Sequence, residues 1–239
     1  MGKVDKTRRR MIFRTLQGAT LVAVGGTFWA GFVQENAKAD LVLRPPGALP
    51  EKDFLATCIH CGLCVEACPF DTLKLGAYGD DVPVGTPYFV PRDIPCYLCE
   101  DIPCAAACPT GALDLLSLTD EDGELDVSKS RMGVAVIDYN NCIANRGLRC
   151  DACVRACPYI EKAIFVDTRR NPRTGKHAML VPVVDADYCT GCGLCEKACV
   201  TDKPTIFVLP REVALGSTGL HYELPPPPNF NEEAPSDEI

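Results

Sequence analysis

The sequence has few of the residues and motifs that enzymes use for catalysis or nucleotide binding. Its 239 residues include three histidines and one tryptophan. It contains neither the GxxxxGK[ST] loop that holds phosphates nor the GxGxxG fingerprint of dinucleotide-binding proteins. His177 and His221 have no nucleophile motif nearby, and His60 lies inside a cysteine-rich loop. We therefore predict no catalytic residues in this chain and no site for a flavin, a nicotinamide or a quinone.

Positive charge is also scarce. The formal net charge is -8 at pH 7. Residues 1–39 hold seven of the 24 Lys and Arg residues and two of the 32 Asp and Glu residues, so the rest of the chain has a formal charge of -13. This excess of acid argues against nucleic acid as a partner, because its phosphates are bound by Lys and Arg. After residue 39 no apolar run of about 18 residues occurs, so we expect a soluble or peripheral protein.

Cysteine is abundant instead, and all sixteen cysteines fall into four groups of four. The first and fourth groups follow the spacing C-x2-C-x2-C-x3-C, which binds [4Fe-4S] clusters in bacterial ferredoxins. We predict that the sixteen cysteines bind the iron of four [4Fe-4S] clusters. They are Cys58, Cys61, Cys64 and Cys68; Cys96, Cys99, Cys104 and Cys108; Cys142, Cys150, Cys153 and Cys157; and Cys189, Cys192, Cys195 and Cys199.

The spacing also predicts that the groups work in pairs. Three sulfurs come from one tight loop, and in two-cluster ferredoxins the fourth cysteine ligates the other cluster of the pair. The two middle groups are expanded, with four residues between Cys99 and Cys104 and seven between Cys142 and Cys150. The fourth group lacks the proline that follows the last cysteine of the others.

Two other uses of these cysteines are weaker alternatives. A disulfide scaffold gives no reason for the same rhythm to occur four times, and disulfides between such close cysteines would close loops too small to stabilise much. Structural zinc favours two separated C-x2-C pairs over a run of four cysteines. The repeated pattern therefore favours iron-sulfur clusters.

The first 39 residues resemble an export signal. Residues 1–14 carry six Lys and Arg residues against one acid, and residues 15–33 carry no charge. The segment from Thr7 to Ile12 resembles a twin-arginine signal, and Ala37 to Ala39 match an A-x-A cleavage site. We expect residues 1–39 to direct the folded, cluster-loaded chain to the periplasm. An uncleaved membrane anchor and a basic amphipathic helix are the alternatives.

The rest of the chain repeats a unit of strand, ligand loop, helical turn and strand. This pattern predicts an α+β fold of two fused bacterial-type 2[4Fe-4S] ferredoxin units with short strands, small helices and long loops. Strands are expected at residues 72–75, 88–90, 112–118, 134–137, 163–167, 181–184 and 205–209. Because the strands are short, we expect metal binding to supply much of the folding free energy and the apoprotein to be largely unfolded.

Several segments resemble one known family. They are LRPPGAL at 43–49, GTPYFVPRDIPC at 85–96, CEDIPCAAACPTGAL at 99–113 and RTGKHA at 173–178. With the N-terminal signal, they resemble the NapG family of ferredoxin-type proteins from periplasmic nitrate reductase systems and its relative MauN from methylamine utilisation. The resemblance extends to about Tyr222 and does not include the acidic, proline-rich segment after it.

The pairing of the groups is open between two arrangements, sequential and nested. The shared CGLC at 61–64 and 192–195 and the resemblance favour nested pairing. The expected domains are then a signal peptide at 1–39, an outer unit of 40–95 plus 158–210, an inner unit of 96–157, and an extended acidic Pro-rich tail at 211–239.

The resemblance also implies a role and partners. It implies a periplasmic electron-transfer protein that relays electrons from a membrane-bound, quinol-oxidising NapH-like iron-sulfur protein toward a periplasmic c-type cytochrome or nitrate reductase. Peripheral membrane association would follow. An iron-sulfur subunit of a molybdenum oxidoreductase and a non-redox assembly or maturation factor are the alternatives.

Overall fold

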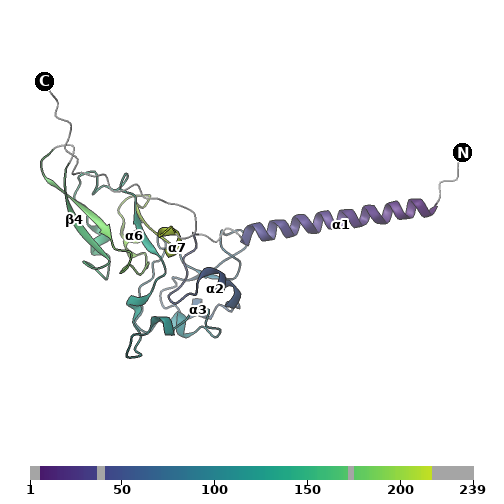
Figure 1. Cartoon of the computed structure of the whole chain (residues 1–239), viewed down its shortest axis with the longest axis horizontal. Helices are drawn as coiled ribbons and strands as arrows, with labels where there is room; N and C mark the ends of the chain where they lie inside the picture. The colour runs from purple at the N-terminus through teal and green to yellow at the C-terminus, as the bar shows by residue number, and fades with distance from the viewer. Residues whose placement is uncertain (1–5, 37–40, 172–174, 217–239) are drawn as a thin grey trace, which may run out of the picture.

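The computed structural model describes residues 6–36, 41–171 and 175–216. Helix α1, Lys6–Asn36, extends away from the rest of the protein (Figure 1). Side chains 10–27 of this helix are all exposed, so they pack against no other element. Among the described residues, no helix is both long enough and apolar enough to cross a membrane.

The first folded unit contains the first two cysteine groups. Its helices are α2, Glu51–Thr57, α3, Leu63–Glu66, and α4, Pro103–Ala106. Strand β1, Lys74–Leu75, pairs antiparallel with β2, Pro87–Tyr88. Two isolated bridges complete the unit, Leu43 with Phe89 and Ala48 with Leu113. The segment before the first group therefore pairs with the segments that flank the second group.

The second folded unit repeats this arrangement around the last two groups. Strand β3, Val134–Ile137, pairs antiparallel with β6, Ile206–Leu209, and β4, Ile164–Arg170, pairs antiparallel with β5, Ala178–Val184. Its helices are α5, Ala152–Arg155, and α6, Leu194–Ala198. The strand before the third group thus lies beside the strand after the fourth group, and the two inner strands form a hairpin.

These pairings correct the nested arrangement. Each unit consists of two consecutive cysteine groups, so the boundaries 40–95 plus 158–210 and 96–157 are wrong. The physical reason is that backbone pairing joins segments that the nested boundaries separate. Strand β3, in the expected inner unit, pairs with β6, in the expected outer unit, and Ala48 of the expected outer unit bridges to Leu113 of the expected inner unit.

Two other expectations need correction. The predicted strand at 112–118 is a single bridge at Leu113 followed by the 3-10 helix η2, Leu116–Leu118. Asp114 favours this turn, because its side chain accepts a hydrogen bond from the Leu116 amide at 2.9 Å and its carbonyl accepts one from Ser117. A second 3-10 helix, η3, spans Val127–Lys129.

The expected tail also begins too early. Residues Arg211–Ala214 form helix α7, in which Val213 is buried. The remainder of the tail, from 217 onward, lies outside the described residues, as do parts of the predicted signal. The extended tail therefore cannot start at 211.

The core is built around the cysteines. Buried residues such as Leu43, Phe54 and Ile206 form one cluster with cysteines from all four groups. The sheets themselves have two strands each. Little of the packing therefore comes from sheet faces, and much of it comes from the loops that carry the cysteines.

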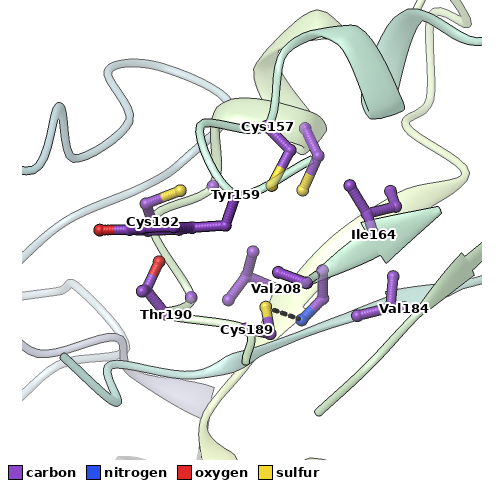
Figure 2. Close-up of a pocket in the computed structure, with 13 residues that line it drawn as sticks. Cys157, Tyr159, Ile164, Val184, Cys189, Thr190, Cys192 and Val208 are labelled. Carbon is purple, nitrogen blue, oxygen red and sulfur yellow. Dashed lines mark hydrogen bonds between the residues drawn. The ribbon is translucent and has the colours of Figure 1, made fainter. Parts of the chain in front are cut away.

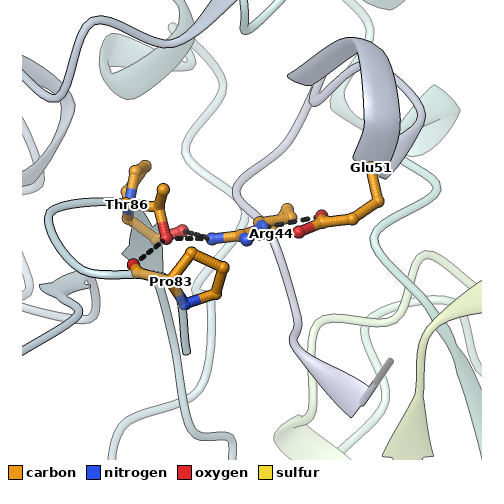
Figure 3. Close-up of polar contacts among 5 residues, drawn as sticks. Arg44, Glu51, Pro83 and Thr86 are labelled. Atoms are coloured by element: carbon orange, nitrogen blue, oxygen red, sulfur yellow. Dashed lines mark hydrogen bonds and ion pairs between the residues drawn. The ribbon is translucent and has the colours of Figure 1, made fainter. Parts of the chain in front are cut away.

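One buried cation fixes the N-terminal segment of the first unit. Arg44 is 6% exposed and donates hydrogen bonds to the Glu51 carboxylate, to the Thr86 hydroxyl at 2.9 Å and to the Pro87 carbonyl at 2.8 Å (Figure 3). Its guanidinium carbon also lies 4.8 Å from the centre of the Phe54 ring. Arg44 thereby links the start of the fold to α2 and to the loop before β2.

Candidate cluster sites

The cysteines surround four cavities, and each cavity receives three cysteines from one group and the fourth cysteine of the neighbouring group. We name each cavity after the group that supplies three. The first is lined by Cys58, Cys61, Cys64 and Cys108; the second by Cys96, Cys99, Cys104 and Cys68; the third by Cys142, Cys150, Cys153 and Cys199; and the fourth by Cys189, Cys192, Cys195 and Cys157.

Short helices and left-handed residues shape the ligand loops. Gly62 and Gly193, with φ of 76° and 82°, stand directly before α3 and α6. A left-handed turn lets the chain reverse around the cavity before the helix begins, and glycine adopts it without steric cost. In the expanded second group, the buried Ile102 takes this position before α4 with φ of 41°. The insertion therefore changes the loop but keeps the turn.

The fourth cavity shows the arrangement in detail. The sulfur atoms of Cys157, Cys189 and Cys192 lie around the same space (Figure 2). Apolar side chains such as Ile164 complete the wall. The Ala135 amide in β3 donates a hydrogen bond to the Cys189 sulfur at 3.5 Å. The cavity therefore combines thiol ligands, an apolar wall and a backbone donor directed at sulfur.

The four cavities fit a [4Fe-4S] cluster by their donor sets and their size. Each has four cysteines, all sixteen cysteines are free, and the cavity volumes are similar, from about 340 to about 400 Å³ including space open to solvent. In the described ranges, no group of three or more His, Cys, Asp or Glu residues is close enough to hold a single metal ion. The sulfurs instead enclose a volume, as ligands of a multinuclear cluster do.

Burial raises the pKa of most of the thiols for which a shift is resolved. It is the main cause that raises the pKa of Cys96, Cys104 and Cys153 to about 12. Neighbouring cysteines contribute in the same direction, because thiolates repel one another. Without metal, these three thiols are therefore protonated at neutral pH, and iron binding must displace their protons.

Cys199 and Cys108 are exceptions. Burial alone would raise the pKa of Cys199. Hydrogen bonds from Thr201 and Thr205 outweigh burial and lower this pKa to about 7. Their hydroxyl oxygens lie 3.0 Å and 3.6 Å from the Cys199 sulfur. At Cys108 burial is likewise outweighed, by the amides of Leu113 and nearby residues, and the pKa is lowered. Cys157, another fourth cysteine, instead has its pKa raised to about 11, mainly by burial.

Sequence reasoning missed these threonines. The signal was available, because a threonine stands two positions after Cys108 and after Cys199, whereas Cys68 and Cys157 are followed at that position by aromatic residues. The Thr110 hydroxyl lies 3.8 Å from the Cys108 sulfur. The first and third cavities therefore each have a hydroxyl near one sulfur.

The electrostatic contacts between cysteines place the cavities in the order first, second, fourth, third. After burial, Cys68 and Cys64 both help to raise the pKa of Cys104, and Cys64 belongs to the first cavity. Cys192 of the fourth cavity contributes in the same way at Cys96 of the second. The pKa of Cys195 is raised mainly by burial and also by Cys153 of the third cavity.

The second and fourth cavities meet at the boundary between the units. The Cys96 amide donates a hydrogen bond to the Cys192 carbonyl at 2.9 Å. A Cβ atom on Gly193 would lie 2.3 Å from the Cβ of Pro91, and one on Gly191 would lie 2.2 Å from the Gly133 nitrogen. Gly193 therefore lies against the segment that leads into the second cysteine group, Gly191 lies against the segment before β3, and at both positions only glycine fits.

Comparisons with known proteins agree with the cysteine geometry. The profile of the 4Fe-4S dicluster domain matches residues 57–112 and 141–203, which are the two units. Ferredoxin-type protein NapG of Escherichia coli (strain K12) is 49% identical over 226 residues, which cover 92% of this chain and 93% of that protein. This chain belongs to the NapG/MauM family of ferredoxin-type proteins.

Two further relatives define the range of the similarity. Methylamine utilization ferredoxin-type protein MauM of Methylobacillus flagellatus is 48% identical over 219 residues, covering 90% of this chain and 89% of that protein. The methylamine relative is thus MauM and not the expected MauN. Thiosulfate reductase electron transfer subunit PhsB of Salmonella typhi is 30% identical over 164 residues, covering 65% of this chain and 68% of that protein.

The family establishes the cofactor and the general role. The chain contains two dicluster domains and holds four [4Fe-4S] clusters, as the sixteen cysteines predict. It is a ferredoxin-type iron-sulfur electron-transfer protein. Small helices and short strands are also confirmed as the framework of the two domains.

Proposed function

We propose that this chain is a periplasmic relay that carries electrons from a membrane-bound, quinol-oxidising, NapH-like partner toward a periplasmic c-type cytochrome or nitrate reductase. The observation that supports it is that neighbouring cysteine-lined cavities connect the first to the second and the fourth to the third through shared cysteine groups, and the second to the fourth through the Cys96 to Cys192 hydrogen bond. A row with two ends suits a protein that receives electrons from one partner and gives them to another.

The sixteen cysteines are the proposed iron ligands, four for each cavity. When bound, a [4Fe-4S] cluster accepts and releases one electron at a time. The chain contributes the thiolates, the apolar walls that limit water, and the amides and hydroxyls that donate to sulfur. Because such donors stabilise the more negative, reduced state, residues such as Ala135 and Thr205 set how readily each site accepts an electron.

The two end cavities reach the surface. Cys61 of the first cavity is exposed, and Ile59 beside it is 63% exposed. Next to the third cavity, Leu148 and Val200 are 61% and 64% exposed. Electron transfer to a partner requires a short path, and these residues place the end cavities near solvent.

Export through the twin-arginine route is part of the proposal. It rests on the basic start of the chain, on the arginines at 8–10 and on the A-x-A sequence at 37–39. That route would allow the clusters to be loaded in the reducing cytoplasm before export. Fractionation of cells that express the chain with Arg8 and Arg9 replaced by Lys should leave it in the cytoplasm, and continued export would exclude this part.

The test of the relay is redox-titrated EPR of the purified holoprotein together with iron and sulfide analysis. We expect about sixteen iron atoms per chain, several midpoints, and reduction by membranes that contain the quinol-oxidising partner and a quinol. Clusters that no quinol-linked donor can reduce and reoxidise would overturn the relay and favour a maturation factor.

A second candidate is an electron-transfer subunit held permanently by a molybdenum oxidoreductase. The similarity to PhsB, an electron transfer subunit of thiosulfate reductase, favours it. A molybdopterin-containing subunit that co-purifies in stoichiometric amount would support this candidate. Isolation of the chain with only the membrane partner would support the relay.

A further inference from the structure

A reciprocal set of hydrogen bonds joins the two units beside the Cys96 to Cys192 contact. Arg92 lies in the segment that leads into the second cysteine group. Its guanidinium donates to the carbonyls of Glu196 at 2.9 Å, Lys197 at 3.3 Å, Cys199 at 3.0 Å and Thr201 at 3.0 Å. These carbonyls lie at and after the C-terminal end of α6, where the helix leaves acceptors without an internal partner.

A side chain of the second unit also binds the main chain of the first. The Lys197 ammonium donates to the Arg92 carbonyl at 3.1 Å and to the Asp93 carbonyl at 2.8 Å. Two side chains from different units thus each hold the main chain of the other. We call Arg92 and Lys197 the clasp. Both side chains are also placed well by charge, since cations are favoured at the C-terminal end of a helix.

The clasp fixes the position of two cluster-binding loops. Cys96 follows Arg92 by four residues, and Lys197 lies between Cys195 and Cys199. Between these anchors, the Cys96 amide bonds to the Cys192 carbonyl at 2.9 Å, so two residues of different cavities are joined by one hydrogen bond. Pro91 packs against Gly193 on the same side.

We propose that Arg92 and Lys197 are positioning residues that set the rate of electron transfer between the two units. This inference rests on the proposed relay function. One electron leaves the reduced cluster of one unit and enters the oxidised cluster of the other, so one is oxidised, the other is reduced, and no bond or proton changes. Because electron transfer weakens steeply with separation, a looser contact slows this step without changing the cluster content.

The experiment uses the full-length holoprotein and the variants Arg92→Ala, Arg92→Lys and Lys197→Met. Arg169→Ala is the matched control, because it also removes one arginine but from β4, where Arg169 pairs with Asp167. A pulse of less than one equivalent of reductant is followed by rapid-freeze EPR until the electron has redistributed. Iron content and hydrogen exchange of the Cys96 amide are measured on the same samples.

We expect slower redistribution and faster amide exchange in Arg92→Ala and Lys197→Met, with sixteen iron atoms retained and the same final distribution. Arg92→Lys should restore part of the rate, because an ammonium keeps the charge but reaches fewer carbonyls. If Arg92→Ala loses iron, the redistribution rates of Lys197→Met and Arg92→Lys are compared with that of the wild-type protein instead.

Three outcomes overturn the inference and leave the relay intact. The first is an unchanged rate of electron redistribution in a variant whose Cys96 amide exchanges faster. The second is a Cys96 amide that exchanges no faster in Arg92→Ala. The third is a redistribution slowed as much in Arg169→Ala as in Arg92→Ala. A role in folding alone would lower the denaturant midpoint but leave the redistribution rate unchanged. Wild-type clusters that cannot be reversibly reduced would overturn the relay itself, and the inference with it.

Discussion

Single residues decide how the first unit is anchored and how individual sulfurs are tuned. Arg44 is a charged side chain that is almost fully removed from solvent, and its partners come from α2 and from the loop before β2. Thr201 and Thr205 place hydroxyls near one sulfur, Cys199. Neither feature is part of a repeated motif, so each gives this chain a property that its cysteine spacing does not.

Replacing Arg44 with Met should destabilise the holoprotein by about 3 kcal/mol, because removing one partner leaves the other charge and two acceptors without their bonds. The measurement is the urea unfolding free energy. Lys74→Met is the control, since Lys74 and Asp93 form an exposed pair with side chains 44% and 56% exposed, and it should cost less than about 1 kcal/mol. Equal losses in the two variants would contradict the role given to Arg44.

Replacing Thr205 with Val should make one cluster midpoint more negative, because the Cys199 sulfur loses a hydroxyl donor while the side chain keeps its shape. Thr205 is the cleaner test, since the Thr201 hydroxyl also contacts the Lys203 carbonyl at 2.7 Å. Redox-titrated EPR measures the shift. Thr119→Val, which removes an exposed hydroxyl bonded to the Leu116 carbonyl, should leave every midpoint unchanged, and an unchanged set in Thr205→Val would refute the assignment.

At the level of elements, short helices and tight loops, rather than long strands, position the cysteines. Helices α3, α4 and α5 have four residues each and α6 has five. Helices of this length have no stability of their own in water. Their positions depend on the turns before them and on the cavities that they border.

Glycine at 191 is predicted to be essential for this loop geometry. With φ of 77°, a Cβ there would lie 2.2 Å from the Gly133 nitrogen, so Gly191→Ala forces backbone away from backbone. Gly123 has φ of 86° but no atom within 4 Å of its Cβ position. We expect Gly191→Ala to lose about four of sixteen iron atoms, whereas Gly123→Ala keeps them all and loses about 1 kcal/mol of stability. Full loading of Gly191→Ala would show that the loop can move.

Local patterns predicted several elements well and failed where a side chain intervened. The strand at 134–137 is confirmed with the expected bounds. The strand at 112–118 is wrong because Asp114 bonds to the amide two residues later and favours a turn. Apolar runs of this length satisfy either structure, and the polar residue inside the run decided between them.

At the level of the whole molecule, the clusters are expected to hold the fold together. The sheets have two strands each, and cysteines belong to the main core cluster. Iron binding should therefore supply much of the folding free energy. Removing iron with a chelator under reducing conditions should abolish most of the secondary structure seen by circular dichroism, and reconstitution should restore it. A native spectrum that persists after complete iron removal would refute this prediction.

The amino-acid sequence by itself determined the cofactor and the family, and it predicted the ligands. Those properties depend on local spacing, because three sulfurs of each site come from a single loop, and the sixteen cysteines contain that information within a few residues. The charge pattern of the sequence also distinguishes the basic N-terminal segment from the acidic, cysteine-rich remainder of the chain.

Only the tertiary structure decided which groups share a unit, which cavities are neighbours and which residues join the units. In the second unit, the antiparallel pairing of β3 with β6 joins residues that are 69 or more positions apart along the chain. Arg92 meets its carbonyl partners across more than 100 residues. Contacts of this kind depend on the packing of the whole chain, and no spacing within a single loop specifies them.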